Sequence, residues 1–149
     1  MQIKVKALHE PTDELIDLLW QLDKAIFSEP YSREKIARTI TTKHQLVCLI
    51  AYANNVPCAF KVGYELSSRV FYSWIGGVVP KYRGNGIAQK LMIVQHDIAS
   101  DLSYRTVRTH TQNKFRDMLL LNIRSGFDVV GVINEPGSGK SVIVLDKTL

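Results

Sequence analysis

Hydrophobic residues recur along this chain with two periods, and these periods predict its strands and helices. Short apolar or alternating runs predict strands at residues 3–7, 46–52, 58–66, 71–79, 106–111, 127–134 and 141–145. Spacing of three and four residues predicts helices at about 13–26, 32–41, 87–100 and 113–124. The order β-α-α-β-β-β-α-β-α-β-β indicates an α/β fold with a mixed sheet, antiparallel in its first hairpins, and one β-α-β crossover.

Capping residues support the boundaries of the predicted helices. Thr12 or Asp13 can cap the first helix by accepting hydrogen bonds from its free N–H groups. Ser32 begins a sequence that resembles a capping box for the second helix. Ser125 and Gly126 end the fourth helix with the usual glycine C-cap.

The pair Asn54-Asn55 predicts a tight turn between the second and third strands. In the simplest register, Ala51 faces Cys58 and Cys48 faces Lys61. The two cysteines then point to opposite faces of the sheet, so we expect no disulfide, as in a reducing compartment. They have no companion histidine at metal-binding spacing, so we expect no metal site either.

The length and composition of the chain are those of a single globular domain, residues 1–149. Hydrophobic residues make up 46% of the chain, and its mean hydropathy is -0.03. No apolar run is long enough to span a membrane, and no charged-then-apolar leader precedes a cleavage site. We therefore expect a cytoplasmic protein with no membrane partner.

The net charge of the chain is +5, from 19 Lys and Arg against 14 Asp and Glu. A positive balance suits a polyanionic ligand, which can be a coenzyme or a nucleic acid. No cluster of five or more basic residues occurs, so we expect no nucleic-acid partner.

The stretch around residues 71–88 has the pattern of an anion site. Pro80 ends an apolar strand because it has no N–H to give to a neighbouring strand. A loop with Gly84 and Gly86 follows, and a helix begins at Ile87. Free N–H groups at a helix start attract anions, and glycine lets a phosphate approach the backbone. The pattern therefore predicts a phosphate-bearing ligand.

Two other interpretations of the glycines fit less well. Gly139-Lys140-Ser141 is similar to the end of a nucleoside-triphosphate loop, but Asn134 stands where that motif needs glycine and a strand follows instead of a helix. Gly84-Asn85-Gly86 begins a dinucleotide fingerprint, but Gln89 stands at its third glycine position. The following strand, residues 106–111, carries no acidic residue for a ribose hydroxyl.

The same stretch carries a family resemblance. The run Val78-x-Pro80-x-x-Arg83-Gly84-x-Gly86-Ile87-Ala88-x-x-Leu91 resembles motif A of the GNAT superfamily of N-acetyltransferases. Asn113, Leu121 and the segment 126–131 resemble motif B, and the element order matches the GNAT fold. The resemblance covers essentially the whole chain, and it implies acetyl-CoA as cosubstrate.

The resemblance also assigns expected roles to residues of the coenzyme site. The backbone N–H groups that would bind the diphosphate are those of Arg83, Gly84, Asn85, Gly86, Ile87 and Ala88. Gly76, Val78 and Val79 would pair with the pantetheine arm, beside a bulge at Gly76-Gly77. The N–H of Val78 would polarise the thioester carbonyl. Asn113 would contact the coenzyme, cap the fourth helix, or do both.

Both catalytic side chains that are common in the family are missing from their usual places. Asn122 stands at the position of the motif B tyrosine, which protonates the leaving thiolate in many members. An amide cannot act as a general acid. Tyr72 stands where some members carry a glutamate base.

Strand geometry suggests substitutes for these catalytic groups. If Ser67-Ser68 forms the next turn, Glu65, Tyr72 and Trp74 share one face of the sheet. Glu65 is then a candidate base, with Tyr72 as proton donor or orienting group. His110, on the fifth strand, is a further candidate. A surface glutamate, a packed tyrosine and a structural histidine are the competing interpretations.

The resemblance leaves the acceptor open. In the family, the first two helices and the break at residues 27–31 form one wall of the acceptor site, which places Glu29 and Tyr31 near an amine. We expect an N-acetyltransferase that moves an acetyl group from acetyl-CoA to a primary amine of a small molecule or peptide, by direct transfer in a ternary complex. The alternatives are a non-catalytic acyl-CoA binding or sensing module and a dimerisation scaffold. Association into a homodimer is compatible with this expectation.

Overall fold

A computed structural model describes residues 1–134, 136–137 and 139–149 of the chain. The strands are β1 (Ile3–Leu8), β2 (Val47–Ala53), β3 (Val56–Ser67), β4 (Val70–Val78), β5 (Thr106–Gln112), β6 (Asp128–Asn134) and β7 (Ser141–Thr148). The helices are α1 (Asp13–Ile26), α2 (Arg33–Thr42), α3 (Ile87–Asp101) and α4 (Arg116–Arg124), with a short 3-10 turn, η1, at Pro80–Tyr82. The predicted order of elements and the α/β class are confirmed.

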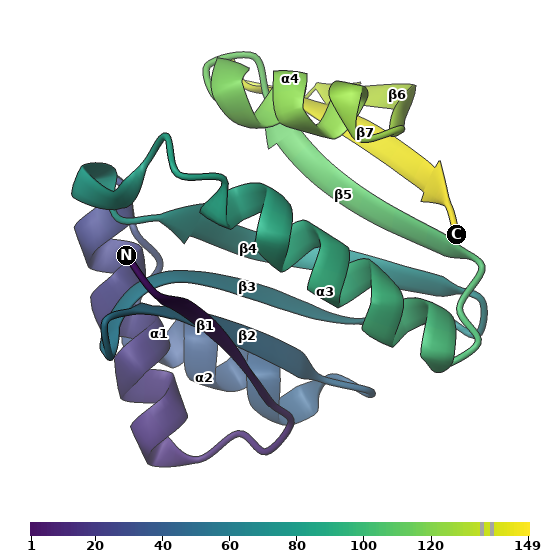
Figure 1. The fold of residues 1–149 in the computed structure, drawn as a ribbon. Coiled ribbons are helices and arrows are strands. Elements are labelled where there is room, and N and C mark those ends of the chain that lie inside the picture. Colours follow the sequence, from purple (N-terminus) through teal and green to yellow (C-terminus); the bar gives the residue numbers. More distant parts are fainter. Residues whose placement is uncertain (135, 138) are drawn as a thin grey trace.

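The strands form one mixed sheet in the order β1-β2-β3-β4-β5-β7-β6. All neighbouring strands are antiparallel except β4 and β5, which are joined by the crossover through α3. Figure 1 shows α3 on one face of the sheet and α1 with α2 on the other. It also shows β5 diverging from β4 along its length, which opens the middle of the sheet.

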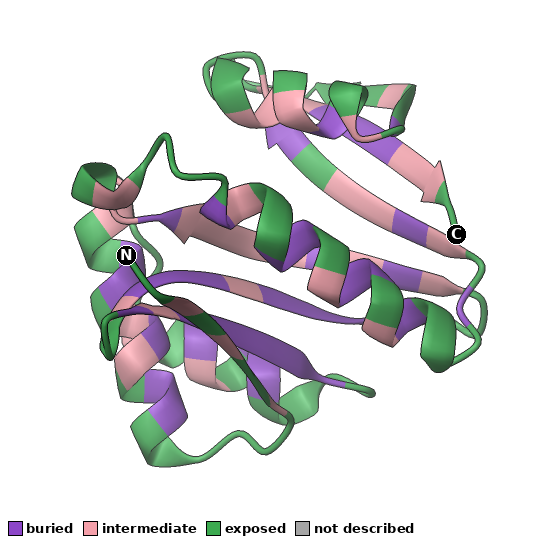
Figure 2. Cartoon of the chain, viewed as in Figure 1, coloured by how far each residue is buried: buried purple, intermediate pink, exposed green. Residues whose placement is uncertain are grey.

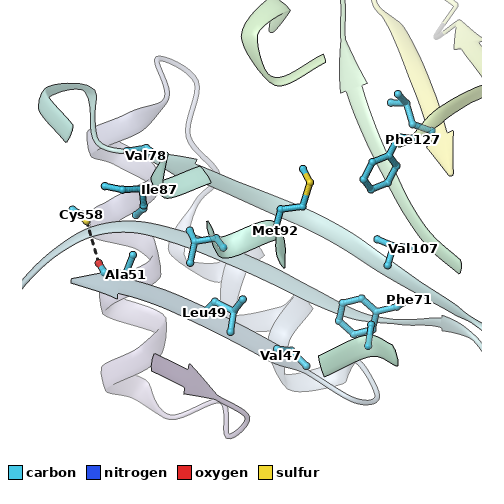
Figure 3. Close-up of a cluster of buried hydrophobic side chains, with 14 of the residues drawn as sticks. Val47, Leu49, Ala51, Cys58, Phe71, Val78, Ile87, Met92, Val107 and Phe127 are labelled. Atoms are coloured by element: carbon cyan, nitrogen blue, oxygen red, sulfur yellow. Dashed lines mark hydrogen bonds between the residues drawn. The ribbon is translucent and has the colours of Figure 1, made fainter. Parts of the chain in front are cut away.

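Two apolar cores lie on the two faces of the sheet (Figure 2). The core beneath α3 includes Leu49, Phe71, Ile87, Leu91, Met92 and Val107. Figure 3 shows part of this core. The core beneath α1 and α2 includes Leu19, Ile36, Ile40, Ile50, Phe60 and Val62. Because a strand points successive side chains to opposite faces, a sheet covered on both sides needs long apolar runs such as β2.

The predicted helix caps are confirmed at three of the ends. Thr12 accepts a hydrogen bond from the Leu15 N–H, and Ser32 accepts one from the Lys35 N–H. Gly126 follows α4 with a φ of 98°, the left-handed geometry expected of a glycine C-cap. No helix in the described part of the chain is long and apolar enough to cross a membrane.

The Asn54-Asn55 turn is confirmed, with φ angles of 48° and 69°, but the register after it differs from the prediction. A bulge between Ala51 and Tyr52 places Ala51 opposite Ala59 and Cys48 opposite Val62. The irregularity lies beside Pro57, which has no N–H for the ladder. The cysteines still lie in different cores, and both are free thiols, as predicted.

Candidate active site

The segment from Pro80 to Ile87 connects β4 to α3 and has the predicted strand–loop–helix geometry. The strand ends at Val78, and Pro80 begins the turn η1. Gly84 and Gly86 adopt φ angles of 79° and 72°. A Cβ would meet no atom within 4 Å at either glycine, so backbone conformation rather than space is what requires glycine there.

The start of α3 leaves backbone donors free. Its N-cap is Gly86, which has no side chain to accept a hydrogen bond from the first turn. The Asn85 side chain instead holds the loop, because its Nδ2 donates to the carbonyls of Tyr82 at 2.9 Å and Arg83 at 3.3 Å. The first N–H groups of α3 therefore face the loop with the positive end of the helix dipole.

A groove of about 220 Å³ lies at this loop and helix start. It is lined by Val78, Tyr82, Arg83, Gly84, Gly86, Ile87, Ala88, Gln89 and Leu121. Most of the residues predicted for diphosphate binding thus surround one concave surface. Within this lining, the Arg83 Nε donates to the Val78 carbonyl at 3.1 Å.

The edge of β4 beyond Ser73 is open. Pairing between β4 and β5 runs only from Val70–Thr106 to Ser73–Thr109, where the Thr109 hydroxyl also donates to the Ser73 carbonyl at 3.1 Å. From Trp74 onward, β4 keeps a partner only on its β3 side. An extended ligand can therefore pair with this free edge as an additional strand.

The N–H of Val78 faces this open edge. The Val79 N–H donates to the Cys58 carbonyl of β3 at 2.8 Å. Because backbone groups alternate in direction along a strand, the N–H and carbonyl of Val78 point away from β3. The Val79 carbonyl accepts from the Tyr82 N–H at 2.9 Å. Both backbone groups of Val79 are thus engaged, and its predicted pairing with pantetheine is wrong.

The predicted bulge at Gly76-Gly77 is also misplaced. The register of β3 and β4 shifts between the pairs Val62–Ile75 and Gly63–Ser73, so the extra residue is Trp74. The two glycines serve close packing instead. A Cβ on Gly76 would lie 2.9 Å from the Phe60 carbonyl oxygen, and one on Gly77 would lie 2.8 Å from Ile26.

A second, narrow cavity of about 10 Å³ adjoins the groove under β4. It is lined by Phe60, Lys61, Gly76, Gly77, Val78, Ala88, Leu91, Met92 and Met118. We call it the strand cavity. Val78 and Ala88 line both spaces, which places the groove and the strand cavity next to each other along β4 and the start of α3.

Four aromatic side chains, which we call the aromatic wall, lie on the α1 and α2 side of the sheet. Tyr31, Tyr64, Tyr72 and Trp74 form it, and ring centroids are 5.4 Å apart for Tyr31 and Trp74 and 5.5 Å apart for Tyr64 and Tyr72. The buried Asp23 carboxylate holds the backbone N–H of Tyr31 at 2.8 Å. Tyr31 therefore lies where the sequence predicts an acceptor wall, at the break between α1 and α2.

His110 joins this wall from β5. Its ring meets that of Tyr72 edge-on, with centroids 5.1 Å apart. Burial lowers the pKa of His110 below the ordinary 6.5, and the nearby Arg108 lowers it further while Asp146 opposes both. Burial, together with the nearby Tyr64 and Tyr31, raises the pKa of Tyr72. At neutral pH the pair therefore consists of an uncharged imidazole and a protonated phenol.

Glu65 does not share the face of Tyr72, so that prediction is wrong. The turn after β3 is Ser68-Arg69, and Glu65 lies opposite Phe71 on the α3 side. Its carboxylate accepts a hydrogen bond from the Tyr104 hydroxyl at 2.9 Å. The pair Ser67-Ser68 suggests a turn at residues 67–68, but it contains no glycine or asparagine to adopt a positive φ. The sequence therefore locates this turn only weakly.

Asn113 is an exposed turn residue between β5 and α4. It does not cap α4, because the helix begins after Phe115 and has no side-chain cap. That part of the prediction is wrong. Asn122, at the position of the usual tyrosine, is 3% exposed. The described residues contain no cluster of three or more side chains that could hold a metal ion.

The sequence model of the Acetyltransferase (GNAT) family matches residues 12–117, which is more than half of the chain. The chain belongs to this family. It is therefore an acyltransferase with acetyl-CoA as cosubstrate. The matched region includes β4, the glycine loop and α3, where the groove and the strand cavity lie.

Solved structures similar to this GNAT chain share its fold at low sequence identity. The NatC complex bound to Gag peptide and CoA is 24% identical, with a TM-score of 0.84, covering 100% of this chain and 99% of that one. The ribosomal-protein-S18-alanine N-acetyltransferase from Escherichia coli is 12% identical, with a TM-score of 0.84 and coverage of 99% and 94%. Naa50 from Arabidopsis thaliana, in complex with the bisubstrate analogue CoA-Ac-MVNAL, is 19% identical, with a TM-score of 0.80 and full coverage of both chains. No curated protein matches the chain.

Proposed function

We propose that this enzyme transfers an acetyl group from acetyl-CoA to the amino group of a peptide, directly within a ternary complex. The observation that carries the proposal is the position of the open β4 edge. The groove and strand cavity reach it from the α3 side, and the aromatic wall with His110 lies on the other side. A donor and an acceptor that enter from opposite faces would meet at this edge.

On the donor side, the free N–H groups from Arg83 to Ala88 would bind the coenzyme diphosphate. Gly76 and Val78 would pair with the pantetheine arm along the open edge. The Val78 N–H would then donate to the thioester carbonyl and stabilise the oxyanion that forms during attack. Asn113, which is exposed at the end of β5, is proposed as a further coenzyme contact.

On the acceptor side, His110 is proposed as the general base and Tyr72 as its orienting partner. An alkyl amine is protonated at neutral pH and must lose a proton before it attacks. The uncharged His110 imidazole can take that proton, directly or through one water. The protonated Tyr72 hydroxyl can donate to the same water or to the acceptor. Glu65 has no part in this scheme, because it faces the other side of the sheet.

A peptide is favoured as acceptor because the similar structures named above carry peptide or protein acceptors in their descriptions. In this chain, Tyr31 and Trp74 offer an aromatic surface beside the reacting edge, against which the first side chains of a peptide can pack. The remaining expectations, a cytoplasmic location, a single working domain of residues 1–149, a homodimer and no nucleic-acid partner, stay predictions.

The test is release of the coenzyme thiol from acetyl-CoA in the presence of peptides that differ in their first two residues. Polyamines, aminoglycosides and free lysine serve as the small-molecule arm. We expect acetylation of the N-terminal amine in a subset of peptides, measured by mass spectrometry. Thiol release only with small amines would overturn the peptide assignment. Coenzyme binding without release over every amine class would favour the sensing module instead.

A further inference from the structure

Lys61 occupies an unusual position for a lysine. It lies on β3 directly opposite Gly76 and lines the strand cavity together with Gly77 and Val78 of β4. The absence of a side chain on Gly76 leaves room for it, since a Cβ there would lie 3.2 Å from the Lys61 Cγ. The lysine stem therefore passes beneath the open strand toward Met92 of α3 and Met118 of α4.

The ammonium group of Lys61 has no partner among the described residues. No hydrogen bond or ion pair joins it to another side chain or to the backbone, and it is the sole titratable side chain among the residues that line the strand cavity. Burial lowers its pKa from 10.5 to about 8. Lys61 is half-buried and lines a cavity whose other residues are uncharged. A cation in such a place without a partner costs stability, so a lysine here indicates a role with an anion or a proton.

The charged and titratable groups nearest to Lys61 do not supply that anion. His96 of α3 faces the same region, and the positive charges of Lys61 and of Lys147 on β7 help to lower its pKa to about 4. The residues of β4 and α4 that line the strand cavity carry no charge. No carboxylate among the cavity-lining residues is available to pair with Lys61.

In the proposed reaction, acetyl transfer would generate an anion at the open edge of β4, beside the strand cavity. When the amine attacks the thioester, a C–N bond forms, the C–S bond breaks and the sulfur departs as a thiolate. The conjugate thiol has a pKa of about 8.5, so the sulfur leaves faster if it receives a proton as the C–S bond breaks. Asn122 cannot provide one, and the described residues that line the strand cavity offer no other acidic group than the Lys61 ammonium.

We propose that Lys61 is the proton donor to the leaving coenzyme A thiolate, an inference that rests on the proposed function above. The Lys61 ammonium passes one proton to the departing sulfur as the C–S bond breaks, and the neutral amine regains a proton from solvent after the thiol leaves. The acidity of Lys61 fits the role, because a donor works best when its pKa is near that of the acceptor and the working pH.

The sulfur end of the coenzyme needs more space than the strand cavity offers, which is about 10 Å³. Met92, Met118 and the lysine stem are the flexible side chains around it, and unbranched side chains of this kind can rearrange at low cost. The same rearrangement would bring the ammonium group of Lys61 against the sulfur of the coenzyme.

The test compares Lys61→Met and Lys61→Arg with the wild type and with Lys6→Met, a matched change of an exposed strand lysine on β1. Methionine keeps the length of the stem and removes the proton. We expect Lys61→Met to lower kcat by about 100-fold, as for loss of a general acid. Its affinity for acetyl-CoA should stay within about threefold of the wild type, because backbone groups bind the coenzyme. Lys6→Met should match the wild type.

Lys61→Arg separates proton transfer from charge. Arginine keeps the positive charge but does not release its proton near neutral pH, so we expect no recovery of kcat. Full activity of Lys61→Arg, or unchanged kcat in Lys61→Met, would overturn the proposal. Loss of acetyl-CoA binding in Lys61→Met would assign Lys61 to coenzyme binding instead. Failure of the wild type to bind acetyl-CoA would overturn the proposed function itself, and this proposal with it.

Two further measurements keep the test independent of folding. Lys61→Met should have a higher Tm than the wild type, because it replaces an unpaired, half-buried cation by an apolar side chain of similar size. In the wild type, kcat at saturating peptide should fall as pH rises through about 8, where Lys61 loses its proton. If kcat keeps rising to about pH 9.5, well past the pKa of a thiol, Lys61 is not the proton donor. Acetylation of Lys61 itself during turnover would also contradict this role.

Discussion

The imidazole of His110 meets the ring of Tyr72 edge-on across the junction of β4 and β5, with centroids 5.1 Å apart. The two residues are 38 positions apart in the chain, and the parallel pairing of β4 with β5 brings them together. They lie at the point where the two strands separate, which is also where the open edge of β4 begins. The proposed acid–base pair therefore depends on the same opening of the sheet that would admit the coenzyme.

His110→Ala should lower kcat by about 100-fold, because it removes the proposed base. Tyr72→Phe should lower kcat by about tenfold, because it removes the hydroxyl that is proposed to donate to the bridging water or to the acceptor. The pH profile provides a sharper measurement. Because the pKa of His110 is lowered below 6.5, wild-type kcat/KM should stay high below pH 6.5 and fall only as pH drops through that lowered value. His44→Ala, a change of an exposed histidine, is the control. An unchanged acid limb in His110→Ala would exclude His110 as the base.

Gly84→Glu should abolish acetyl-CoA binding, because it places a carboxylate where the diphosphate would lie and forces a positive φ on a residue with a Cβ. Gly137→Glu is a matched control, since Gly137 has a φ of 80° and no atom within 4 Å of where its Cβ would lie, but belongs to the β6–β7 connection. Isothermal titration with acetyl-CoA would measure both variants. Equal affinity in the two would count against the loop as the diphosphate site.

Gly76→Ala should destabilise the protein by about 1–3 kcal/mol, the usual cost of overpacking, because the new methyl group would lie 2.9 Å from the Phe60 carbonyl oxygen. It should also weaken coenzyme binding, since the contact would push β4 away from β3 at the edge that is proposed to pair with pantetheine. Gly131→Ala on β6 meets no neighbouring atom within 4 Å and serves as the control. Urea unfolding would measure the change in stability, and titration with acetyl-CoA would measure the change in affinity. If Gly76→Ala has the same free energy of unfolding as the wild type, β3 and β4 are less tightly packed at this position than the structure indicates.

His96 should make the fold sensitive to acid. It is 7% exposed, its Nε2 has no hydrogen-bond partner, and burial lowers its pKa from 6.5 to about 4. The unfolded chain therefore binds a proton at higher pH than the folded one. The stability from an uncharged His96 is complete above pH 6.5 and is lost as pH falls from 6.5 through about 4, by an amount on the order of 3 kcal/mol.

Unfolding free energies measured between about pH 7 and pH 4, the range between the ordinary and the lowered pKa of His96, would check this expectation. His96→Leu should lose less stability over that range than the wild type, whereas His44→Leu, at an exposed position, should follow the wild type. If His96→Leu and the wild type lose stability in parallel, another group is responsible for the acid sensitivity.

Much of the donor side could be predicted from local sequence signals. Pro80 ends a strand because it lacks an N–H, Gly84 and Gly86 allow positive φ angles, and the helix that starts at Ile87 follows directly. Each of these constraints acts within a few residues. The element order could be predicted for the same reason, since hydrophobic periodicity is a local property.

The catalytic side could not be predicted in the same way, because it depends on strand register. The turn lies one residue later than expected, and the register shifts between Glu65 and Ser67, so the extra residue Leu66 places Glu65 opposite Phe71 and on the other face from Tyr72. In a strand, a slip of one residue reverses the face of every side chain beyond it. The sequence does not show where the ladder takes up an extra residue.

The sequence by itself therefore determined the order of elements and the glycine loop that begins α3, since periodicity, proline and glycine act on the backbone locally. Only the tertiary structure decided which side chains meet. It brought Tyr72 and His110 into contact across the parallel pair β4 and β5. It also placed the Lys61 side chain beneath Gly76, where there is room for it only because the neighbouring strand carries a glycine. Those contacts join residues far apart in the chain, and packing across the sheet rather than local propensity establishes them.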